Sequence, residues 1–364
     1  MSSDPLRVAL DTTGLELDAG GSARAIEALR AELERRTDVE LLAMRHGGQP
    51  GSGWRRLVRG LHRELVYMPI QLPRRAAQAG ADLLHCPVGV ASTRSRVPLV
   101  VTVNDVMAIE HPEWFTRANA LQQRHVLPRA LAAATRVIVP SHYTRERVLA
   151  TCDVEPARVD VVPYGVAPAF TTGRADAGAL VRIGVEEPYV LTVGTLQPRK
   201  NLAAAVAAFE RAAEGVPHTL VVAGARGWRD DAVVEMLQQR SVSPRIRVLG
   251  EVGDDQLVEL YRGADCLLFP SLYEGFGFPV LEAMACGTPV VCADRTSLPE
   301  VAGDAAVLVD PDDTVAIASA LAEVLSSPAR RAELADAGLA RVREFSWRRC
   351  ADRTVGVYHR ALGH

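Results

Sequence analysis

Residues 264–291 decide the fold of this chain: Ala264-Asp-Cys-Leu-Leu-Phe-Pro-Ser-Leu-Tyr-Glu-Gly-Phe-Gly-Phe-Pro-Val-Leu-Glu-Ala-Met-Ala-Cys-Gly-Thr-Pro-Val-Val291. The apolar run 264–270 predicts a buried strand, and the glycines after it predict a turn into a helix whose first residue is Pro279. Glu274 then lies at the carboxyl end of the strand, and Glu282 lies one turn into the helix. Two carboxylates around such a turn suit a hydroxyl-rich, anionic ligand, because acids accept hydrogen bonds from hydroxyls and a helix start binds phosphate.

The same turn offers backbone groups to a phosphate. Gly275 and Gly277 lack side chains, so a phosphate or diphosphate can closely approach the N–H groups at the helix start. A carboxylate one turn further in would compete with that phosphate for the helix dipole. We therefore expect Glu282 to accept hydrogen bonds from neighbouring hydroxyls, such as those of a ribose. The alternative is an ordinary acid in the first helical turn.

Short apolar runs alternate with stretches of helical character along the whole chain. They lie at 7–10, 39–43, 82–86, 98–103, 136–140 and 159–163, and again at 189–193, 219–223, 245–249, 265–270, 289–293 and 305–309. This alternation predicts an α/β fold with parallel strands, organised as two doubly wound, Rossmann-like domains. At 364 residues the chain also exceeds the usual size of one hydrophobic core.

We expect three segments in the domain organisation. Residues 1–172 form an N-terminal domain, 173–345 a C-terminal domain, and 346–364 a docking helix. The boundary is placed near Gly173 because 166–178 is small, polar and poorly periodic, as interdomain linkers are. The final segment carries its apolar residues at helical spacing, which predicts one docking face.

Composition and charge exclude several classes of protein. A net charge of −3, from 41 basic and 44 acidic side chains, gives no global attraction to nucleic acid. No apolar run approaches membrane-spanning length, so we expect a cytoplasmic protein. The cysteines include no Cys-x-x-Cys pair and are expected to be reduced and buried: Cys86, Cys152, Cys266, Cys286, Cys292 and Cys350.

Loops after the strands hold the candidate site residues, because doubly wound sheets bind ligands beyond the carboxyl ends of their strands. The loop Gly194-Thr-Leu-Gln-Pro-Arg-Lys-Asn201 delivers Arg199 and Lys200 just before Asn201, the expected helix N-cap. Cations at a helix start oppose the helix dipole, which favours a functional role over a solvated pair. They would bind phosphate oxygens and stabilise charge on a departing diphosphate.

Other loops give weaker signals. Asn104-Asp105 ends an apolar strand and either faces the ligand or forms a structural Asx-turn, whereas His85 is more often a structural residue. Gly20 and Gly21 allow close approach at a helix start, without the Gly-x-Gly-x-x-Gly pattern of nicotinamide enzymes. Asp310-Pro-Asp312 has the composition of an exposed turn, so we expect no metal site.

The segment from Trp54 to Val66 is amphipathic. Its apolar residues share one helical face, and the basic residues lie mostly on the other: Arg55, Arg56, Arg59 and Arg63. We expect it to pack on the N-terminal domain with a solvated basic face. Peripheral contact with the inner face of a membrane is the alternative.

Taken together, these residues resemble the family-four (group 1) retaining glycosyltransferases of the GT-B fold, in their mannosyltransferase-like form. The resemblance spans nearly the whole chain and is strongest from Val190 to Pro311. Its marks are Glu-x7-Glu at Glu274 and Glu282, Val193-Gly-Thr-Leu-Gln-Pro-Arg-Lys-Asn201, Val162-Pro-Tyr-Gly-Val166 and Ser297-Leu-Pro-Glu-Val-Ala-Gly303.

The resemblance implies two domains facing a cleft, with the acceptor received by the first domain and a nucleotide-diphosphate sugar held by the second. It also implies that the final helix crosses back onto the first domain, and that no cofactor or metal is needed. Glu274 would hold hydroxyls of the donor sugar, while Arg199 and Lys200 would hold the diphosphate. Asn104 and Asp105 would lie near the reacting sugar, where many relatives carry His-Asp. The other residues expected at the donor are Glu282 at the ribose, Val252 at the base, and Gly275, Phe276, Gly277, Phe278, Pro279, Val280, Gly194, Thr195, Gly20 and Gly21 at its phosphates or sugar.

We therefore predict a retaining, metal-independent enzyme that moves a hexose from GDP-mannose, or secondly UDP-glucose, to an acceptor hydroxyl. The acceptor is a glycan, a lipid-linked saccharide or a natural product. Two alternatives of other kinds stay open here: a sugar-nucleotide epimerase of the same architecture, and a non-catalytic sugar-nucleotide sensor, which Asn104 makes conceivable because an amide cannot titrate near neutral pH.

Overall fold

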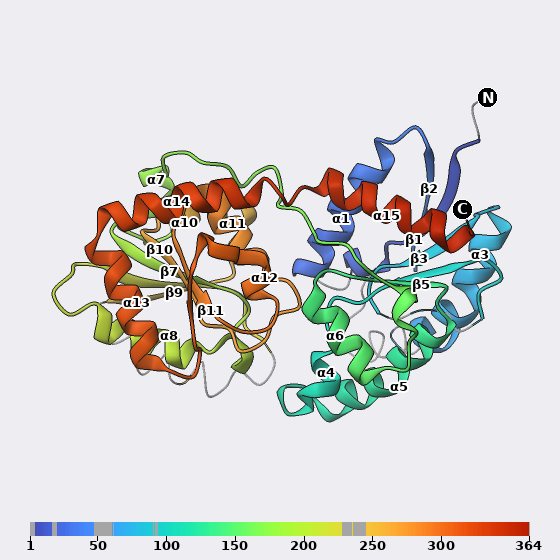
Figure 1. The fold of residues 1–364 in the computed structure, drawn as a ribbon, viewed down its shortest axis with the longest axis horizontal. Helices are drawn as coiled ribbons and strands as arrows, with labels where there is room; N and C mark the ends of the chain where they lie inside the picture. Colours follow the sequence, from blue (N-terminus) through green and yellow to red (C-terminus); the bar gives the residue numbers. More distant parts are fainter. Residues whose placement is uncertain are drawn as a thin grey trace. The chain divides into compact units, whose positions relative to one another are not determined.

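A computed structural model of the chain describes residues 4–16, 20–46, 60, 62–89, 91, 94–227, 235 and 245–363. The chain forms two compact units, each a parallel sheet covered by helices (Figure 1). The first unit comprises Met1–Glu110, Arg117–Gly165 and Trp347–His364. The second comprises His111–Thr116 and Val166–Ser346.

The first unit has a parallel sheet with the strand order β2-β1-β3-β4-β5-β6. Its strands are continuous apolar runs, because helices cover both faces of a parallel sheet. The strands are β1 (Leu6–Asp11), β2 (Val39–Met44), β3 (Leu83–Cys86), β4 (Leu99–Thr102), β5 (Arg136–Val139) and β6 (Val159–Val161). The order reverses at β1, which pairs with β2 on one side and β3 on the other.

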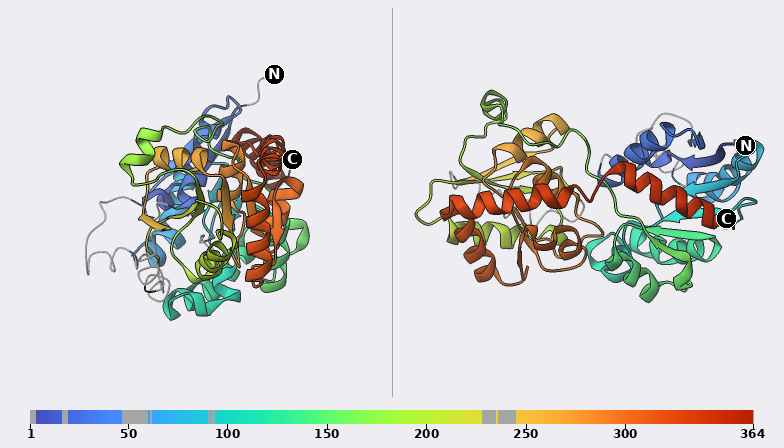
Figure 2. Two further views of the ribbon diagram at one scale, coloured as in Figure 1. Left: turned by 90° about the vertical axis from the view of Figure 1, so that its left-hand side faces the viewer. Right: turned by 45° about the horizontal axis from the view of Figure 1, so that its top comes forward.

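Helices bury the first core, which includes Leu84, Val101 and Leu131. They are α1 (Gly21–Glu34), α3 (Leu72–Gln78), α4 (Met107–Glu110), α5 (Arg117–Ala133), α6 (His142–Thr151) and α15 (Trp347–Leu362), with 3-10 turns η1 (Thr13–Glu16) and η4 (Pro156–Arg158) and a π-helix η2 (Arg63–Gln71). The last helix, α15, packs beside α1, so segments from the two ends of the chain lie side by side within this unit (Figure 2).

The second unit has a parallel sheet with the order β12-β11-β10-β7-β8-β9. Its strands are β7 (Tyr189–Val193), β8 (Thr219–Ala223), β9 (Ile246–Gly250), β10 (Cys266–Phe269), β11 (Val290–Ala293) and β12 (Val307–Val309). The sheet grows from β7 through β8 in one direction and through β10 in the other, so the winding reverses between β7 and β10. Doubly wound sheets bind ligands at such a reversal point, beyond the carboxyl ends of the strands.

Helices α8 and α13 pack against each other on one face of this sheet, and α10 and α11 lie on the other (Figure 1). The helices are α7 (Ala177–Arg182), α8 (Leu202–Ala212), α10 (Asp254–Gly263), α11 (Phe278–Cys286), α12 (Leu298–Ala302), α13 (Thr314–Ser326) and α14 (Pro328–Val342), with 3-10 turns η3 (Pro112–Trp114), η5 (Pro198–Lys200) and η6 (Gly303–Ala305). Phe209, Leu268 and Leu321 belong to the hydrophobic core of this unit.

The predicted α/β fold with two doubly wound sheets is confirmed, and the strands lie where the apolar runs placed them. All six cysteines are free and buried, as expected. Helix α11 begins at Phe278 rather than at Pro279 as predicted, because Gly277, with φ +116°, already turns the chain into the helix. The chain passes into the second unit at Val166, and the Thr171 carbonyl accepts a hydrogen bond from Arg262 Nε at 2.9 Å there.

Candidate active site

Two loops of the second unit meet at the reversal point of its sheet. One follows β7 and carries Arg199 and Lys200 on η5, and the other follows β10 and carries Glu274. The strands are parallel neighbours, with Cys266 opposite Val190, so both loops leave the same edge of the sheet. The topology thus brings together side chains that are 74 residues apart in the chain.

Glu274 receives three hydrogen bonds on one carboxylate oxygen. Its Oε1 accepts from Lys200 Nζ at 2.6 Å, from Ser271 Oγ at 2.7 Å and from Arg199 Nη1 at 2.9 Å. Arg199 Nη1 also donates to the Tyr273 carbonyl at 3.1 Å. The expected sugar-binding acid and the expected diphosphate-binding cations therefore form one network, here called the Glu274 network (Glu274, Arg199, Lys200 and Ser271).

Burial and charge act in opposite directions within this network. Burial raises the pKa of Glu274, but the charges of Arg199 and Lys200 outweigh it and bring the pKa to about 2. Burial lowers the pKa of Lys200 to about 8, although the Glu274 charge opposes the change. The ammonium also lies 4.6 Å from the centre of the Phe269 ring. Both partners are consequently charged at neutral pH, with Lys200 close to losing its proton.

One side of the Glu274 network is available to a ligand. No described residue donates a hydrogen bond to Glu274 Oε2, and none accepts one from Arg199 Nη2. Neither of these two unbonded atoms is fully buried, so a ligand can reach both. A carboxylate oxygen accepts from a hydroxyl, and a guanidinium donates to phosphate oxygens, so the exposed side suits a sugar phosphate ester.

A loop after β11 holds the backbone of the Glu274 loop. Thr296 Oγ1 accepts from Glu274 N at 3.2 Å, and Ser297 Oγ donates to the carbonyls of Glu274 and Phe276 at 2.9 and 2.8 Å. Thr296 has φ +61°, a conformation that is rare for a β-branched residue and costs roughly 1–3 kcal/mol. Such strain persists where the surroundings fix the backbone, and here they fix the loop that presents the carboxylate.

Two glycines occupy positions that a side chain would disturb. A Cβ on Gly277 would lie 2.7 Å from Leu298, and a Cβ on Gly194, whose φ is +139°, would lie 2.8 Å from Lys200 Cε. Gly277 therefore lets the loop turn into α11, and Gly194 leaves room for the lysine. Thr195 follows it at the carboxyl end of β7. Asn201, the expected side-chain cap of α8, instead donates from Nδ2 to the Pro311 carbonyl at 2.7 Å.

Glu282 lies inside α11 and is only 3 % exposed. Its Oε2 accepts a hydrogen bond from the Tyr261 hydroxyl on α10 at 2.9 Å. Burial lowers the pKa of Lys200, and Glu282 is one of the charges that oppose this, so both acids act on the same lysine. The sequence offered no signal for Tyr261, which occupies an apolar position of its helix.

In the first unit, Asn104 is bonded at both ends of its amide. Nδ2 donates to Ser22 Oγ at 2.9 Å, and Oδ1 accepts from the Tyr164 hydroxyl. Ser22 follows Gly21, the first residue of α1, so the glycine turn and Asn104 lie together as candidates of one site. Asp105 Oδ1 accepts from Met107 N at 3.0 Å, which is the Asx-turn that the sequence left open.

The remaining weak candidates have structural partners. The buried ring of His85 bonds to the hydroxyls of Tyr358 and Thr102, and burial lowers its pKa to about 3. Asp310 and Asp312 both pair with Arg295, at 2.8 and 2.6 Å. Within the described ranges, no group of three or more His, Cys, Asp or Glu side chains is arranged to hold a metal ion.

Two family models match the chain. Residues 181–341 match the glycosyl transferases group 1, and residues 19–170 match glycosyltransferase family 4. O-antigen chain mannosyltransferase B of Escherichia coli is 31% identical over 265 residues, which cover 71% of this chain and 69% of that protein. The chain belongs to the group 1 glycosyltransferases. A D-inositol 3-phosphate glycosyltransferase of Rhodococcus jostii is also 31% identical, over 75% of this chain and 63% of its own length.

Solved structures share the fold of this glycosyltransferase. Sucrose-phosphate synthase from Thermosynechococcus elongatus aligns with a TM-score of 0.77 at 21% identity, covering 98% of this chain and 99% of that one. HepE from Anabaena, solved with UDP and glucose, aligns with a TM-score of 0.74 at 19% identity, covering 97% and 99%. The GT-B architecture is confirmed, and the chain is an enzyme, a glycosyltransferase of the hexosyltransferase type.

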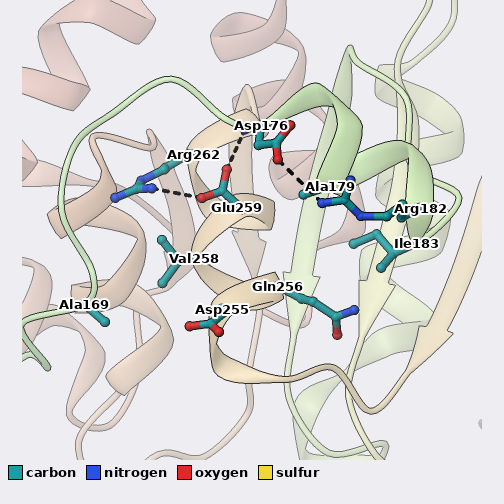
Figure 3. A pocket seen from close by; sticks show the side chains of 10 residues that line it. All are labelled: Ala169, Asp176, Ala179, Arg182, Ile183, Asp255, Gln256, Val258, Glu259 and Arg262. Carbon is teal, nitrogen blue, oxygen red and sulfur yellow. Dashed lines mark hydrogen bonds and ion pairs between the residues drawn. The ribbon is translucent and has the colours of Figure 1, made fainter.

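A cavity of about 460 Å³ in the second unit of this glycosyltransferase shares no residue with the Glu274 network (Figure 3). It lies between α7, α10 and the segment before α7, and its charged residues other than Asp255 bond to one another. Glu259 accepts from Arg262 Nη1 at 2.9 Å and from Asp176 N at 2.6 Å. We assign no donor group to this cavity, because most of its charged side chains are already paired with one another.

Two expectations about ligand and membrane contacts concern other parts of the chain. Val252 is half-buried in the turn after β9, where the base was predicted. Most of the segment from Trp54 to Val66 lies outside the described residues. In the described part of this glycosyltransferase, no helix is both long and apolar enough to cross a membrane.

Proposed function

We propose that this enzyme transfers a hexose from a nucleotide-diphosphate sugar to a hydroxyl of a glycan, a lipid-linked saccharide or a natural product, with retention at the anomeric carbon. The donor is held by the second unit. The observation that carries the proposal is the Glu274 network, in which one carboxylate oxygen binds two cations and leaves Oε2 for a ligand. A carboxylate beside two cations matches the sugar and the diphosphate of such a donor.

Each part of the donor has a residue of fitting chemistry. Glu274 Oε2 accepts from hydroxyls of the hexose, Arg199 and Lys200 bind the diphosphate, and the backbone from Gly275 to Val280 approaches a phosphate at the start of α11. We assign the ribose to Glu282, the base to the turn at Val252, and the surroundings of the phosphates to Gly194 and Thr195. The assignments at Glu274, Arg199 and Lys200 rest on burial, charge and position at the reversal point, and the assignments at Glu282 and Val252 rest on the resemblance to group 1 glycosyltransferases.

In the reaction, the bond between the anomeric carbon and the diphosphate oxygen breaks while the acceptor hydroxyl oxygen bonds to the same face of that carbon. The departing diphosphate oxygen takes the acceptor proton. Asn104 cannot titrate near neutral pH, so it contributes position rather than proton transfer. The protein accelerates this step by orienting both reactants and by stabilising the negative charge on the diphosphate with Arg199 and Lys200, without a metal.

GDP-mannose is our first donor and UDP-glucose the second. The mannosyltransferase among the relatives supports mannose, and the UDP-bound and UDP-glucose-bound structures of HepE, which share the fold, keep UDP-glucose in consideration. A cytoplasmic location, with peripheral membrane contact through the segment from Trp54 to Val66, stays a prediction.

Isothermal titration calorimetry with GDP, UDP, GDP-mannose and UDP-glucose tests the proposal. The wild type should bind one sugar nucleotide more tightly than its parent diphosphate. Glu274→Gln should lose that preference yet still bind the diphosphate, because Arg199 and Lys200 remain while Oε2 loses its charge. Glu214→Gln, an exposed acid of the same unit, is the matched control and should behave as the wild type. Absence of binding by all four ligands would refute the proposal.

A further inference from the structure

Three aromatic side chains gather directly beside the Glu274 network. His111 and Trp114 stack with ring centres 4.2 Å apart and an interplanar angle of 15°. Both meet the Tyr273 ring edgewise, at 5.6 and 6.4 Å. Tyr273 precedes Glu274 in the chain, and Arg199 Nη1 bonds to both residues. We name this group the aromatic platform (His111, Trp114 and Tyr273).

The platform is built on a short segment that belongs to the second unit although both flanking segments belong to the first. Its backbone is fixed by the 3-10 turn η3, in which Trp114 N donates to the His111 carbonyl at 3.1 Å and Phe115 N to the Pro112 carbonyl at 3.1 Å. Phe115 is 7% exposed and Tyr273 is 2% exposed, so both side chains are buried. The ring positions are therefore set before any ligand binds.

Two rings of the platform, those of His111 and Trp114, reach solvent. The His111 side chain is 39% exposed, and Trp114 is partly exposed. The chain has only four tryptophans, and this one is stacked at the candidate site instead of filling the core. Aromatic faces carry partial negative charge and attract polarised C–H groups, so they suit the apolar face of a sugar ring.

We propose that the aromatic platform binds the acceptor as a pyranoside, with a C–H face of its ring against the outer face of the His111–Trp114 stack. This inference rests on the proposed function, because it places the acceptor beside the donor sugar at Glu274. Transfer requires the two sugars to be neighbours, and the platform begins one residue from the carboxylate assigned to the donor hexose. The charged member of the segment is Glu113, whose carboxylate bonds to His111 Nδ1 at 3.1 Å, so the platform favours an uncharged ring over an anionic one.

Saturation-transfer NMR with methyl α-D-mannopyranoside and methyl α-D-glucopyranoside, in the presence of GDP or UDP, tests the inference. Sorbitol, an open-chain polyol, is the control ligand. We expect transfer to the ring C–H protons of at least one pyranoside and none to sorbitol. Trp114→Ala should weaken pyranoside binding about tenfold, as expected for one lost aromatic contact, while Trp114→Phe should retain it.

Trp114→Ala and Trp114→Phe must bind GDP or UDP as tightly as the wild type does. Equal affinity would show that the donor site is intact in both variants. Arg117→Gln changes an exposed residue just after the segment and should leave pyranoside binding unchanged. Equal pyranoside binding by Trp114→Ala and the wild type would overturn the inference. So would failure of both pyranosides to bind a protein that binds the diphosphate. If the diphosphate fails to bind as well, the proposed function falls too.

Discussion

Replacing Lys200 by methionine should make the protein more stable and less able to bind its donor. Lys200 is the only lysine in the chain, and it is 8% exposed. Burial lowers its pKa from 10.5 to about 8, despite the neighbouring Glu274. That difference corresponds to roughly 3 kcal/mol by which the folded state disfavours the charged form. Methionine has a similar shape without the charge, so Lys200→Met should stabilise the protein at pH 7 by up to about 3 kcal/mol.

The opposite effect must also be weighed. Removing one partner of a buried ion pair usually destabilises by about 3–5 kcal/mol, because a charge is left buried alone. Here Glu274 keeps Arg199 at 2.9 Å and Ser271 at 2.7 Å on the same oxygen, so its charge retains a cation and a donor. The relief of lysine burial should therefore exceed the lost attraction. Glu274→Gln should lower the stability instead. The pKa of Glu274, about 2, means that its carboxylate stabilises the fold by roughly 3 kcal/mol.

The pH dependence separates these two contributions. Below pH 8 the folded chain carries the full burial cost of Lys200. Between pH 8 and 10.5 the folded lysine loses its proton before the unfolded one, so the advantage of Lys200→Met should shrink over that window. The Glu274 contribution is present above pH 4.5 and is lost as the pH falls to about 2. Diphosphate affinity of the wild type should weaken as pH rises through 8, and Lys200→Met, which has no charge to lose, should not show this change.

Urea unfolding of wild type, Lys200→Met and Glu274→Gln at pH 7 and 9.5 measures these differences. Arg211→Met, an exposed cation on α8, is the control and should change stability by no more than about 0.5 kcal/mol. Because the chain has one lysine, the pH dependence of its acylation rate gives the Lys200 pKa directly, with the N-terminal amine as the other reactive group. Destabilisation by Lys200→Met at pH 7 would refute the reasoning.

Three further predictions concern the support of the site and the first unit. Gly277→Ala should lower the free energy of unfolding in urea by roughly 1–3 kcal/mol, because φ is +116° and the added methyl would lie 2.7 Å from Leu298. An unchanged free energy of unfolding would show that the loop relaxes freely. Tyr261→Phe removes a hydrogen-bond donor to the buried Glu282, so it should lower stability by about 1–3 kcal/mol and weaken nucleotide binding in calorimetry. Unchanged affinity would separate Glu282 from the ribose. Tyr358→Phe removes a hydroxyl bond in the first unit, so it should lower stability by about 1 kcal/mol without changing donor affinity.

The strands and the two-sheet fold were predictable because each strand of a parallel sheet is a continuous apolar run that a local pattern reveals. The position of Glu274 at a strand end followed from the same pattern. Its bonds to Arg199 and Lys200 did not, because they join loops 75 and 74 residues apart, and their existence depends on β7 and β10 being neighbours. A pattern within either loop holds no information on that pairing.

Asn104 shows the same division between local and long-range information. Its place after an apolar strand was visible, and so was the loss of a titratable group. Its partners Ser22 and Tyr164 lie 82 and 60 residues away, so only the fold shows that the amide is held at both ends. Ser271 was within reach of the sequence, since it opens the loop of Glu274, but nothing in the sequence distinguished it from an ordinary loop serine.

The use of one lysine among 41 basic residues needs a physical reason, since arginine serves everywhere else. The space beside Gly194 is narrow, because even a methyl group there would lie 2.8 Å from Lys200 Cε. A compact ammonium fits between that backbone, the Phe269 ring and Glu274 Oε1, whereas a planar guanidinium presents a wide fork. Glu274, which is assigned to the sugar, also holds Arg199 and Lys200, which are assigned to the diphosphate. Losing the sugar contact would therefore shift the cations, and losing the diphosphate contact would shift the carboxylate. The network therefore couples recognition of the two halves of the donor, which explains why a costly buried charge is retained at the reversal point of the sheet.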